Sequence, residues 1–285
     1  MRTAAYFPLQ CARNSVPVMN AILDFLRASG YTLEENGMDS DIAVIWSVLW
    51  NGRMAANQQV YEHYRSLGRP VIVADIGALY RGHTWKIAVN NINGNGYYGH
   101  TENLDYDRPG KLGISLAIPV FNRPEILIAA QHQHSLQVAD LPSIEAWIFK
   151  QILRIRELTE RPIIVRPHPR YKLNPNYLPD DIVWETPNQL TNTYDSFDMH
   201  FDCHAVVNYN SGTGIQAAIS GTRPIVDRSS LAYPVSVTMA ELEQPYIVDR
   251  DRWLIEICHT EYTLTEIQQG LWFKRILPAL STAPV

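Results

Sequence analysis

Short apolar segments rich in β-branched residues alternate with amphipathic segments that end in glycine, and this alternation most constrains the fold. Gly30 and Gly68 follow the first two amphipathic segments, and a glycine at that place commonly ends a helix. Strand, helix and strand in succession predict a parallel sheet covered by helices. The predicted elements are strands at 2–7, 41–46 and 69–75 and helices at 18–29 and 54–67.

The same alternation starts again at residue 126, after a loop-rich segment at 76–124. Ser143 is a suitable N-cap for a long helix whose apolar face includes Ile144, Trp147, Ile148 and Leu153. The sequence therefore predicts an α/β protein with two Rossmann-like layers that face a cleft. The further predicted elements are strands at 126–130, 162–165, 182–184, 205–210 and 222–227, a helix around 189–197 and a helical pattern over 238–280.

A stiff basic loop follows the predicted strand at 162–165, with the sequence Arg166-Pro-His168-Pro-Arg170. The two prolines fix φ and remove two backbone donors, so the strand cannot continue. Open α/β sheets bind ligands beyond the carboxyl ends of their strands, and guanidinium groups match phosphate oxygens. The loop predicts a phosphate site, and the alternative is a surface turn that happens to be basic.

The strand at 205–210 leads into Ser211-Gly212-Thr213-Gly, which begins a predicted helix. A helix N-terminus has free N–H groups and a partial positive charge, which suit a diphosphate. Ser211 and Thr213 add hydroxyl groups, and glycine lets a ligand approach the backbone. Many helices begin in this way, so the turn indicates a phosphate site mainly in combination with the basic loop in the same half of the chain.

Together these two segments resemble the donor-binding half of GT-B glycosyltransferases, including capsule-polysaccharide enzymes that use CMP-Kdo and bacterial sialyltransferases with a His-Pro motif. Residues 127–131 are similar to the first strand and Gln-containing turn of that half, whereas Gln216 stands where those families usually carry Glu. The resemblance implies domains at 1–124 (acceptor side) and 125–260 (donor side), with a helical tail at 261–285 that crosses back to the first domain. It also implies a nucleotide-sugar donor and no further cofactor. The donor-binding residues that it implies are Arg166, His168, Arg170, Gln131, Ser211, Gly212, Thr213 and Gln216.

Asp75 ends the predicted strand at 69–75 and is the candidate catalytic base. A carboxylate beyond the end of a strand is suitably placed to accept the proton of an acceptor hydroxyl. Residues 73–79 are also loosely similar to the Glu-Asp-Gly-Phe-Leu segment of the acceptor half in the same family. The alternative is a carboxylate that caps a helix or a loop.

The segment at 76–124 combines aromatic and basic residues with Asn-Gly turns. It predicts either a small aromatic core or an acceptor-binding platform, because aromatic faces bind sugars and bases. The segment loosely resembles compact phage proteins that modify DNA, which favours 5-hydroxymethylpyrimidine bases in DNA as acceptor over a cell-surface glycan. An epimerase-like enzyme and a non-catalytic nucleotide- or glycan-binding protein remain alternatives. The candidate acceptor-binding residues are Arg81, Trp85, Lys86, Tyr97, Tyr98 and Lys111.

The composition limits the other possible functions. A formal net charge of −5 over 285 residues counts against a general nucleic-acid binder. Cys11, Cys203 and Cys258 are widely spaced, so no disulfide framework or zinc site is predicted, and a cytoplasmic location is expected. His132-Gln-His134 has no carboxylate close in sequence, and no metal site is predicted. No apolar run approaches the length that spans a bilayer.

Overall fold

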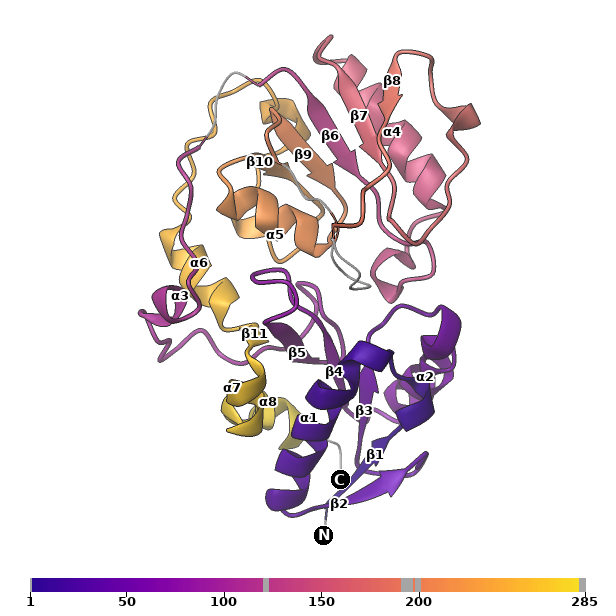
Figure 1. Ribbon diagram of the computed structural model, residues 1–285, viewed down its shortest axis with the longest axis vertical. Coiled ribbons are helices and arrows are strands. Elements are labelled where there is room, and N and C mark those ends of the chain that lie inside the picture. Colours follow the sequence, from indigo (N-terminus) through magenta and orange to yellow (C-terminus); the bar gives the residue numbers. More distant parts are fainter. Residues whose placement is uncertain (1, 120–122, 191–196, 198–200, 282–285) are drawn as a thin grey trace. The chain divides into compact units, whose positions relative to one another are not determined.

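The computed structural model describes residues 2–119, 123–190, 197 and 201–281, and it divides into two compact units. Unit 1 comprises Met1–Arg108 and Glu256–Val285, and unit 2 comprises Pro109–Ile255. Each unit contains its own sheet, as Figure 1 shows. The predicted boundaries at residues 124 and 260 lie further along the chain than these divisions.

Unit 1 is built on a six-stranded sheet in the order β11-β5-β4-β3-β1-β2. The four strands β2, β1, β3 and β4 are parallel, and β5 and β11 add to the β4 edge in antiparallel orientation. Its strands are β1 (Arg2–Tyr6), β2 (Tyr31–Glu35), β3 (Ile42–Trp46), β4 (Val71–Ile76), β5 (Trp85–Val89) and β11 (Glu261–Tyr262). All five residues of β3 are buried, as its continuous apolar sequence predicts for a central parallel strand.

The main core of unit 1 lies between this sheet and helices from both ends of the chain. Ile22 and Leu26 of α1 pack in it with Trp272 and Ile276 of α8. Helix α2 packs against β3 and β4 without joining that cluster. The helices of unit 1 are α1 (Val16–Ala28), α2 (Asn57–Ser66), α7 (Leu264–Gln268) and α8 (Leu271–Ser281).

Unit 2 has an all-parallel five-stranded sheet in the order β10-β9-β6-β7-β8. Its strands are β6 (Ile126–Ala129), β7 (Ile163–Arg166), β8 (Ile182–Trp184), β9 (Ala205–Asn208) and β10 (Arg223–Ile225). Its helices are α4 (Ile144–Arg156) and α5 (Gly212–Ile219), while α3 (Arg108–Lys111) and α6 (Asp251–Cys258) run across the divisions between the units. The prediction of an α/β protein with parallel sheets is confirmed.

Helix α4 begins as predicted, because the Ser143 hydroxyl accepts a hydrogen bond from the Ala146 N–H at 3.0 Å. Ile144, Trp147 and Ile148 are buried as expected. Leu153 was predicted on the same face, but its side chain is 50% exposed. One residue advances the helix by about 100°, so burial of Ile152 turns Leu153 toward solvent.

Three predictions of secondary structure differ from the structure. Strand β5 lies within the segment predicted to be irregular, and β11 interrupts the predicted helical run at 238–280. Gln189 and Phe197, which were expected to bound a helix, pair instead in an antiparallel bridge, and residues 191–196 lie outside the described part of the chain. Ile87 and Val89 of β5 belong to the core of unit 1, so this strand is part of the sheet and not of an irregular loop.

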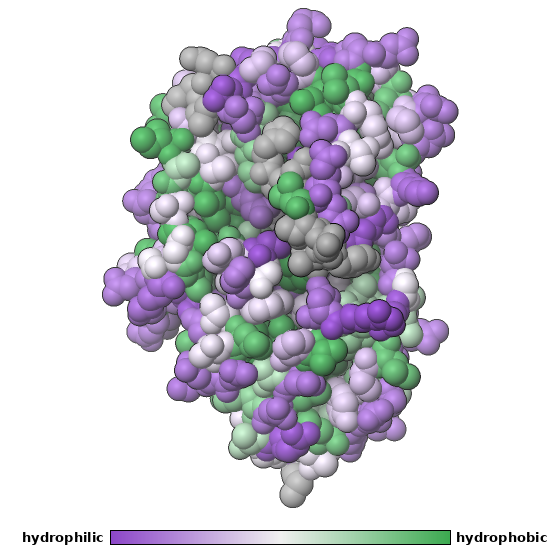
Figure 2. Space-filling view, viewed as in Figure 1, coloured by the Kyte–Doolittle hydropathy of each residue, from purple (hydrophilic) through white to green (hydrophobic). Residues whose placement is uncertain are grey.

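On the face shown in Figure 2, hydrophilic and hydrophobic residues are interspersed. Within residues 2–119, 123–190 and 201–281, none of the helices has both the length and the apolar character needed to cross a membrane.

Candidate functional site

The order of the strands in unit 2 reverses between β6 and β9, which are neighbours in the sheet. Ligands of doubly wound sheets bind at this switch point, outside the carboxyl ends of the strands. Gln131 follows β6 and Asn210 follows β9, and both are buried. The Gln131 side-chain amide donates to Asn210 Oδ1 at 2.9 Å, and the Asn210 N–H donates to Gln131 Oε1 at 2.7 Å. Gln131 therefore joins the two loops that flank the switch point.

A wider hydrogen-bond network fixes the same loops. The Asn210 side-chain amide donates to the Gln137 carbonyl and to Ser229 Oγ, both at 2.8 Å. The Ser229 hydroxyl in turn donates to Asp227 Oδ1 at 2.7 Å. The loops after β6, β9 and β10 are thus connected by side chains, so the edge of the sheet is rigid before any ligand binds. Because both polar atoms of the Gln131 amide face Asn210, its evident contribution is to position this edge.

The loops after β6 and β7 meet through aromatic rings. The ring of His132 lies 5.3 Å from the ring of His168, edge to face, and 4.9 Å from the ring of Tyr171. His168 Nδ1 accepts a hydrogen bond from the Arg170 N–H at 3.2 Å, so the imidazole folds back onto its own loop. His132 and Tyr171 were not predicted as site residues. For His132, the sequence signal was its place beside Gln131, just after β6.

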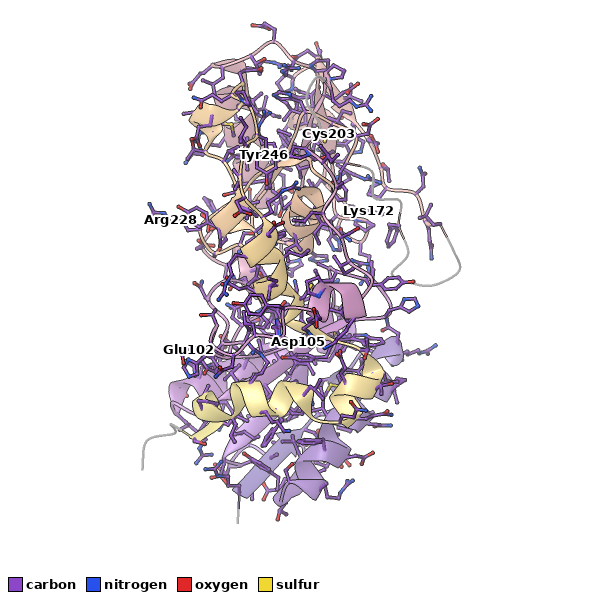
Figure 3. All side chains as sticks on the ribbon, turned by 90° about the vertical axis from the view of Figure 1, so that its left-hand side faces the viewer. Glu102, Asp105, Lys172, Cys203, Arg228 and Tyr246 are labelled. Atoms are coloured by element: carbon purple, nitrogen blue, oxygen red, sulfur yellow. The ribbon has the colours of Figure 1, made fainter. Side chains whose placement is uncertain are left out.

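This edge carries positive charge. Arg166 is 5% exposed and lies 3.7 Å from Glu185, while Arg170 is half-buried on the loop surface. Burial, together with the charges of His134 and Arg170, lowers the pKa of His132 to about 4. His132 is therefore neutral at pH 7, and the guanidinium groups supply the charge. Lys172, labelled in Figure 3, is an exposed residue of the same loop.

Helix α5 begins at the carboxyl end of β9 with Ser211 as its N-cap. The Ser211 hydroxyl accepts a hydrogen bond from the Thr213 N–H, and Asn208 Oδ1 accepts from the Ser211 N–H at 2.9 Å. A side chain at Gly214 would lie 2.9 Å from Val226 Cγ1, so glycine lets α5 pack closely on the sheet. Gly212, Thr213 and Gln216 lie half-buried in the first two turns of α5. The structure thus brings the predicted donor residues of unit 2 to the carboxyl edge of one sheet.

A second polar group lies in unit 1 at the carboxyl end of β4. The Ser47 hydroxyl donates to Asp75 Oδ2 at 3.0 Å, and the Ile76 N–H donates to Asp75 Oδ1 at 2.7 Å. Lys86 of β5 lies directly opposite Asp75, and Glu261 of β11 lies directly opposite Lys86. Directly paired residues of antiparallel strands point to the same face, so these three ionisable side chains share one face of the sheet.

Glu261 is fully buried, and its carboxylate shapes the loop after β4. It accepts hydrogen bonds from the N–H groups of Ala78 and Leu79 at 2.7 and 3.0 Å and from the Thr84 hydroxyl at 2.7 Å. Buried carboxylates need such donors to offset the loss of water. This role was not predicted, because Glu261 was expected in a helical tail.

The predicted acceptor-binding residues are dispersed. Lys86 and Tyr98 are 6% and 8% exposed, so neither presents a surface for stacking or phosphate contact. Trp85 and Tyr97 pack against the main core of unit 1. Arg81 is exposed in the loop after β4, whereas Lys111 is exposed and belongs to unit 2.

The loop after β4 carries an exposed aromatic pair that the prediction missed. The rings of Tyr80 and His83 stack with their centroids 4.0 Å apart and their planes 17° apart. Tyr80 is 51% exposed. This pair, unlike Tyr98, presents an aromatic face to solvent.

Within the described residues, no group of three or more His, Cys, Asp or Glu side chains has an arrangement that holds a metal ion.

No protein-family model matches the sequence, and no curated protein matches it. Among solved structures, the chain is similar to two Thermosulfurimonas dismutans proteins, the KpsC beta Kdo 2,4 transferase and the KpsC beta Kdo 2,7 transferase. The first is 12% identical with a TM-score of 0.47, the second is 11% identical with a TM-score of 0.49, and each alignment covers 95% of this chain and 98% of the other. A Methanocaldococcus jannaschii UDP-GlcNAc 2-epimerase is 11% identical with a TM-score of 0.30, over 90% of this chain and 91% of that chain.

Proposed function

We propose that this protein is a glycosyltransferase that moves a sugar from a nucleotide-sugar donor to a hydroxyl group. The observation that carries the proposal is the arrangement at the carboxyl edge of the sheet in unit 2. Three features meet at this edge. They are the paired hydrogen bonds between Gln131 and Asn210, the loop that carries His168 and Arg170, and the start of α5. Such an edge suits a phosphate group, which binds to guanidinium groups and is attracted by the partial positive charge of a helix start.

The proposed donor site acts on the leaving group. As the bond between the anomeric carbon and the phosphate oxygen breaks, the electron pair stays on that oxygen and negative charge grows there. Arg170, His168 and the partial positive charge at the start of α5 stabilise this charge, and a network that is already fixed loses little energy in reorganising. Arg166, also predicted to bind the donor, is buried and lies 3.7 Å from Glu185.

Asp75 is the proposed base for the acceptor hydroxyl. Its carboxylate accepts hydrogen bonds from the Ser47 hydroxyl and the Ile76 N–H, and it lies at the carboxyl end of β4. The proton passes to Asp75 as the hydroxyl oxygen forms its bond to the anomeric carbon. With Asp75→Asn we expect donor binding to persist and transfer to fall by about 10²-fold or more, because an amide cannot accept the proton.

We propose a glycan as the acceptor, in place of the 5-hydroxymethylpyrimidine bases predicted from the sequence. A flipped base needs exposed aromatic faces, and the flanking phosphates need exposed cations. Tyr98 and Lys86, which were expected to supply these contacts, are buried. The exposed Tyr80 and His83 pair offers an aromatic surface of a size that suits a single sugar ring.

The experiment is a panel of CMP-, UDP-, GDP- and dTDP-sugars incubated with the purified protein, with donor cleavage and product formation followed by mass spectrometry. Acceptors are oligosaccharides and, in parallel, DNA that contains hydroxymethylcytosine or hydroxymethyluracil. Transfer to an oligosaccharide supports the proposal, and transfer to DNA alone would restore the DNA acceptor. Nucleotide binding without cleavage of any donor would instead indicate a non-catalytic binding protein.

The donor site is tested by His168→Ala and Arg170→Ala. Each substitution is expected to lower kcat/KM. The corresponding rise in activation free energy is about 2–4 kcal/mol, as for a lost contact to the charge of the transition state. Arg154→Ala is the matched control, because Arg154 is an exposed arginine on α4 of the same unit. Wild-type kcat/KM in both site variants would show that the phosphate binds elsewhere.

A further inference from the structure

Ser47, directly after β3, has a backbone conformation that its residue type rarely adopts. Its φ is 63°, and the other non-glycine residues with positive φ in the described chain are Asn36, Asn90 and Asn103. Asparagine tolerates the left-handed region, whereas serine is strained there. A turn of this shape alone would favour glycine or asparagine at position 47. Strained residues persist where the surrounding structure holds them, and they cluster at functional sites.

The contacts of Ser47 direct its hydroxyl proton to Asp75. The side chain is buried, with 5% exposure, and its Oγ accepts a hydrogen bond from the Leu49 N–H at 3.1 Å. With that lone pair occupied, the hydroxyl donates to Asp75 Oδ2 at 3.0 Å. The Ser47 N–H donates to the Ala74 carbonyl at 2.7 Å, which fixes the backbone beside β4.

The position of Ser47 in the sheet is an independent observation. The order β2-β1-β3-β4 reverses between β1 and β3, so the switch point of unit 1 lies at the carboxyl ends of these strands. The Asn57 side-chain amide donates to the Trp46 carbonyl at 2.8 Å and to the Gln10 carbonyl at 3.0 Å, which ties the end of β3 to the segment that follows β1. Ser47 is the next residue after Trp46, so it is held at the place where such sheets bind ligands.

We propose that Ser47 is a positioning residue that fixes the orientation of the Asp75 carboxylate for proton transfer from the acceptor hydroxyl. The inference rests on the proposed function, in which Asp75 is the base. Ser47 gives up no proton in the reaction. Its hydrogen bond, together with that from the Ile76 N–H, prevents rotation of the carboxylate while Asp75 takes the acceptor proton. The strained backbone at position 47 is the structural cost of placing the hydroxyl there.

Ser47→Gly separates this role from a structural one, because it removes the hydroxyl and relieves the backbone at the same time. We expect Tm to stay the same or rise by about 2 °C, and kcat to fall by about tenfold or more with the donor KM unchanged. Loss of a hydrogen bond to the ionised carboxylate also moves the acidic limb of the pH profile of kcat/KM to higher pH.

Ser47→Thr and Asn36→Gly are the matched variants. Threonine keeps the hydroxyl but is strained further by its β-branch, so this variant is expected to be less stable than Ser47→Gly and yet more active. Asn36 is an exposed left-handed residue of unit 1, with φ 55°, and glycine there should leave activity and its pH profile unchanged.

The outcomes distinguish this inference from the proposed function. If Asp75→Asn is inactive while Ser47→Gly keeps wild-type kcat and an unmoved pH profile, only the role of Ser47 is overturned. If Ser47→Gly loses stability and activity together, Ser47 is a structural residue and the inference is again wrong. Full activity of Asp75→Asn would instead overturn the assignment of the base in the proposed function.

Discussion

Tyr98 is buried with a hydroxyl that has no hydrogen-bond partner among the described residues. Burial, followed by the nearby carboxylates of Glu261 and Asp75, raises the pKa of this hydroxyl well above its ordinary value. A buried hydroxyl without a partner costs free energy. Tyr98→Phe is therefore expected to leave the free energy of unfolding unchanged or raise it by about 1 kcal/mol, as measured by urea denaturation. A loss of about 2 kcal/mol or more would mean that the hydroxyl has a partner in solution.

His132 predicts how stability depends on pH. Its folded pKa, about 4, lies below the ordinary value of 6.5, so the unfolded chain binds a proton more readily than the folded protein does. The contribution of His132 to stability is thus fully present above pH 6.5 and is lost progressively as the pH falls toward 4.

Between pH 6.5 and 5, proton binding at His132 is expected to lower the free energy of unfolding by about 2 kcal/mol. Urea denaturation at several pH values measures it, with His132→Gln as the reference because glutamine does not titrate. The free energy of unfolding should fall less steeply with decreasing pH in the variant. Equal slopes in both proteins would show that His132 is accessible to protons in the folded state.

At the scale of elements, the loop after β4 depends on a close approach at Gly77. A methyl group at this position would lie 2.6 Å from Thr84 Oγ1 and closer still to Glu261 Oε2 and the Thr84 carbonyl. Gly77→Ala is expected to lower the free energy of unfolding by about 2 kcal/mol or more, since neither the carboxylate nor the backbone can move cheaply. Gly110→Ala, where no atom lies within 4 Å, is the control and should change stability by less than about 0.5 kcal/mol.

The elements that the sequence predicted well are those whose stability is local. Strands β3 and β7 are continuous apolar runs, and α4 has both an apolar face and a serine N-cap. Strand β11 has two residues and exists only because it pairs with β5, so no local pattern marks it.

The candidate sites, too, could be predicted only where their residues are close together in the sequence. The basic loop from Arg166 to Arg170 is contiguous in sequence, and Asp75 directly ends an apolar run. The Ser47 contact with Asp75 spans 28 residues, and the Glu261 contact with Ala78 spans 183. Contacts over such separations depend on the topology of the sheet, which a pattern in the sequence does not specify.

At the scale of the whole molecule, Arg108 holds the returning chain in unit 1. Its buried guanidinium donates to the Cys258 carbonyl at 2.5 Å, the Glu261 carbonyl at 2.6 Å and the Glu266 carboxylate at 2.7 Å. Arg108→Met is expected to lower the free energy of unfolding by about 3–5 kcal/mol, because Glu266 and two carbonyls lose their donor together.

Arg27→Met is the control for Arg108. Arg27 pairs with Asp24 at 2.6 Å, but both side chains are more than 60% exposed, so the change is expected to be within about 1 kcal/mol. Denaturation followed by tryptophan fluorescence compares the two variants. Equal small losses in both would mean that the Arg108 contacts are not maintained in solution.

Unit 1 is assembled from two stretches of chain, with the whole of unit 2 inserted between them. During synthesis the ribosome releases residues 109–255 before β11, α7 and α8 emerge. Unit 2 is continuous and has all its strands available first, whereas the core of unit 1 waits for Trp272 and Ile276. Nascent domains commonly fold as soon as they are complete. Unit 2 is therefore expected to fold before unit 1, and a nascent chain stalled near residue 255 would expose the incomplete core of unit 1 to chaperones.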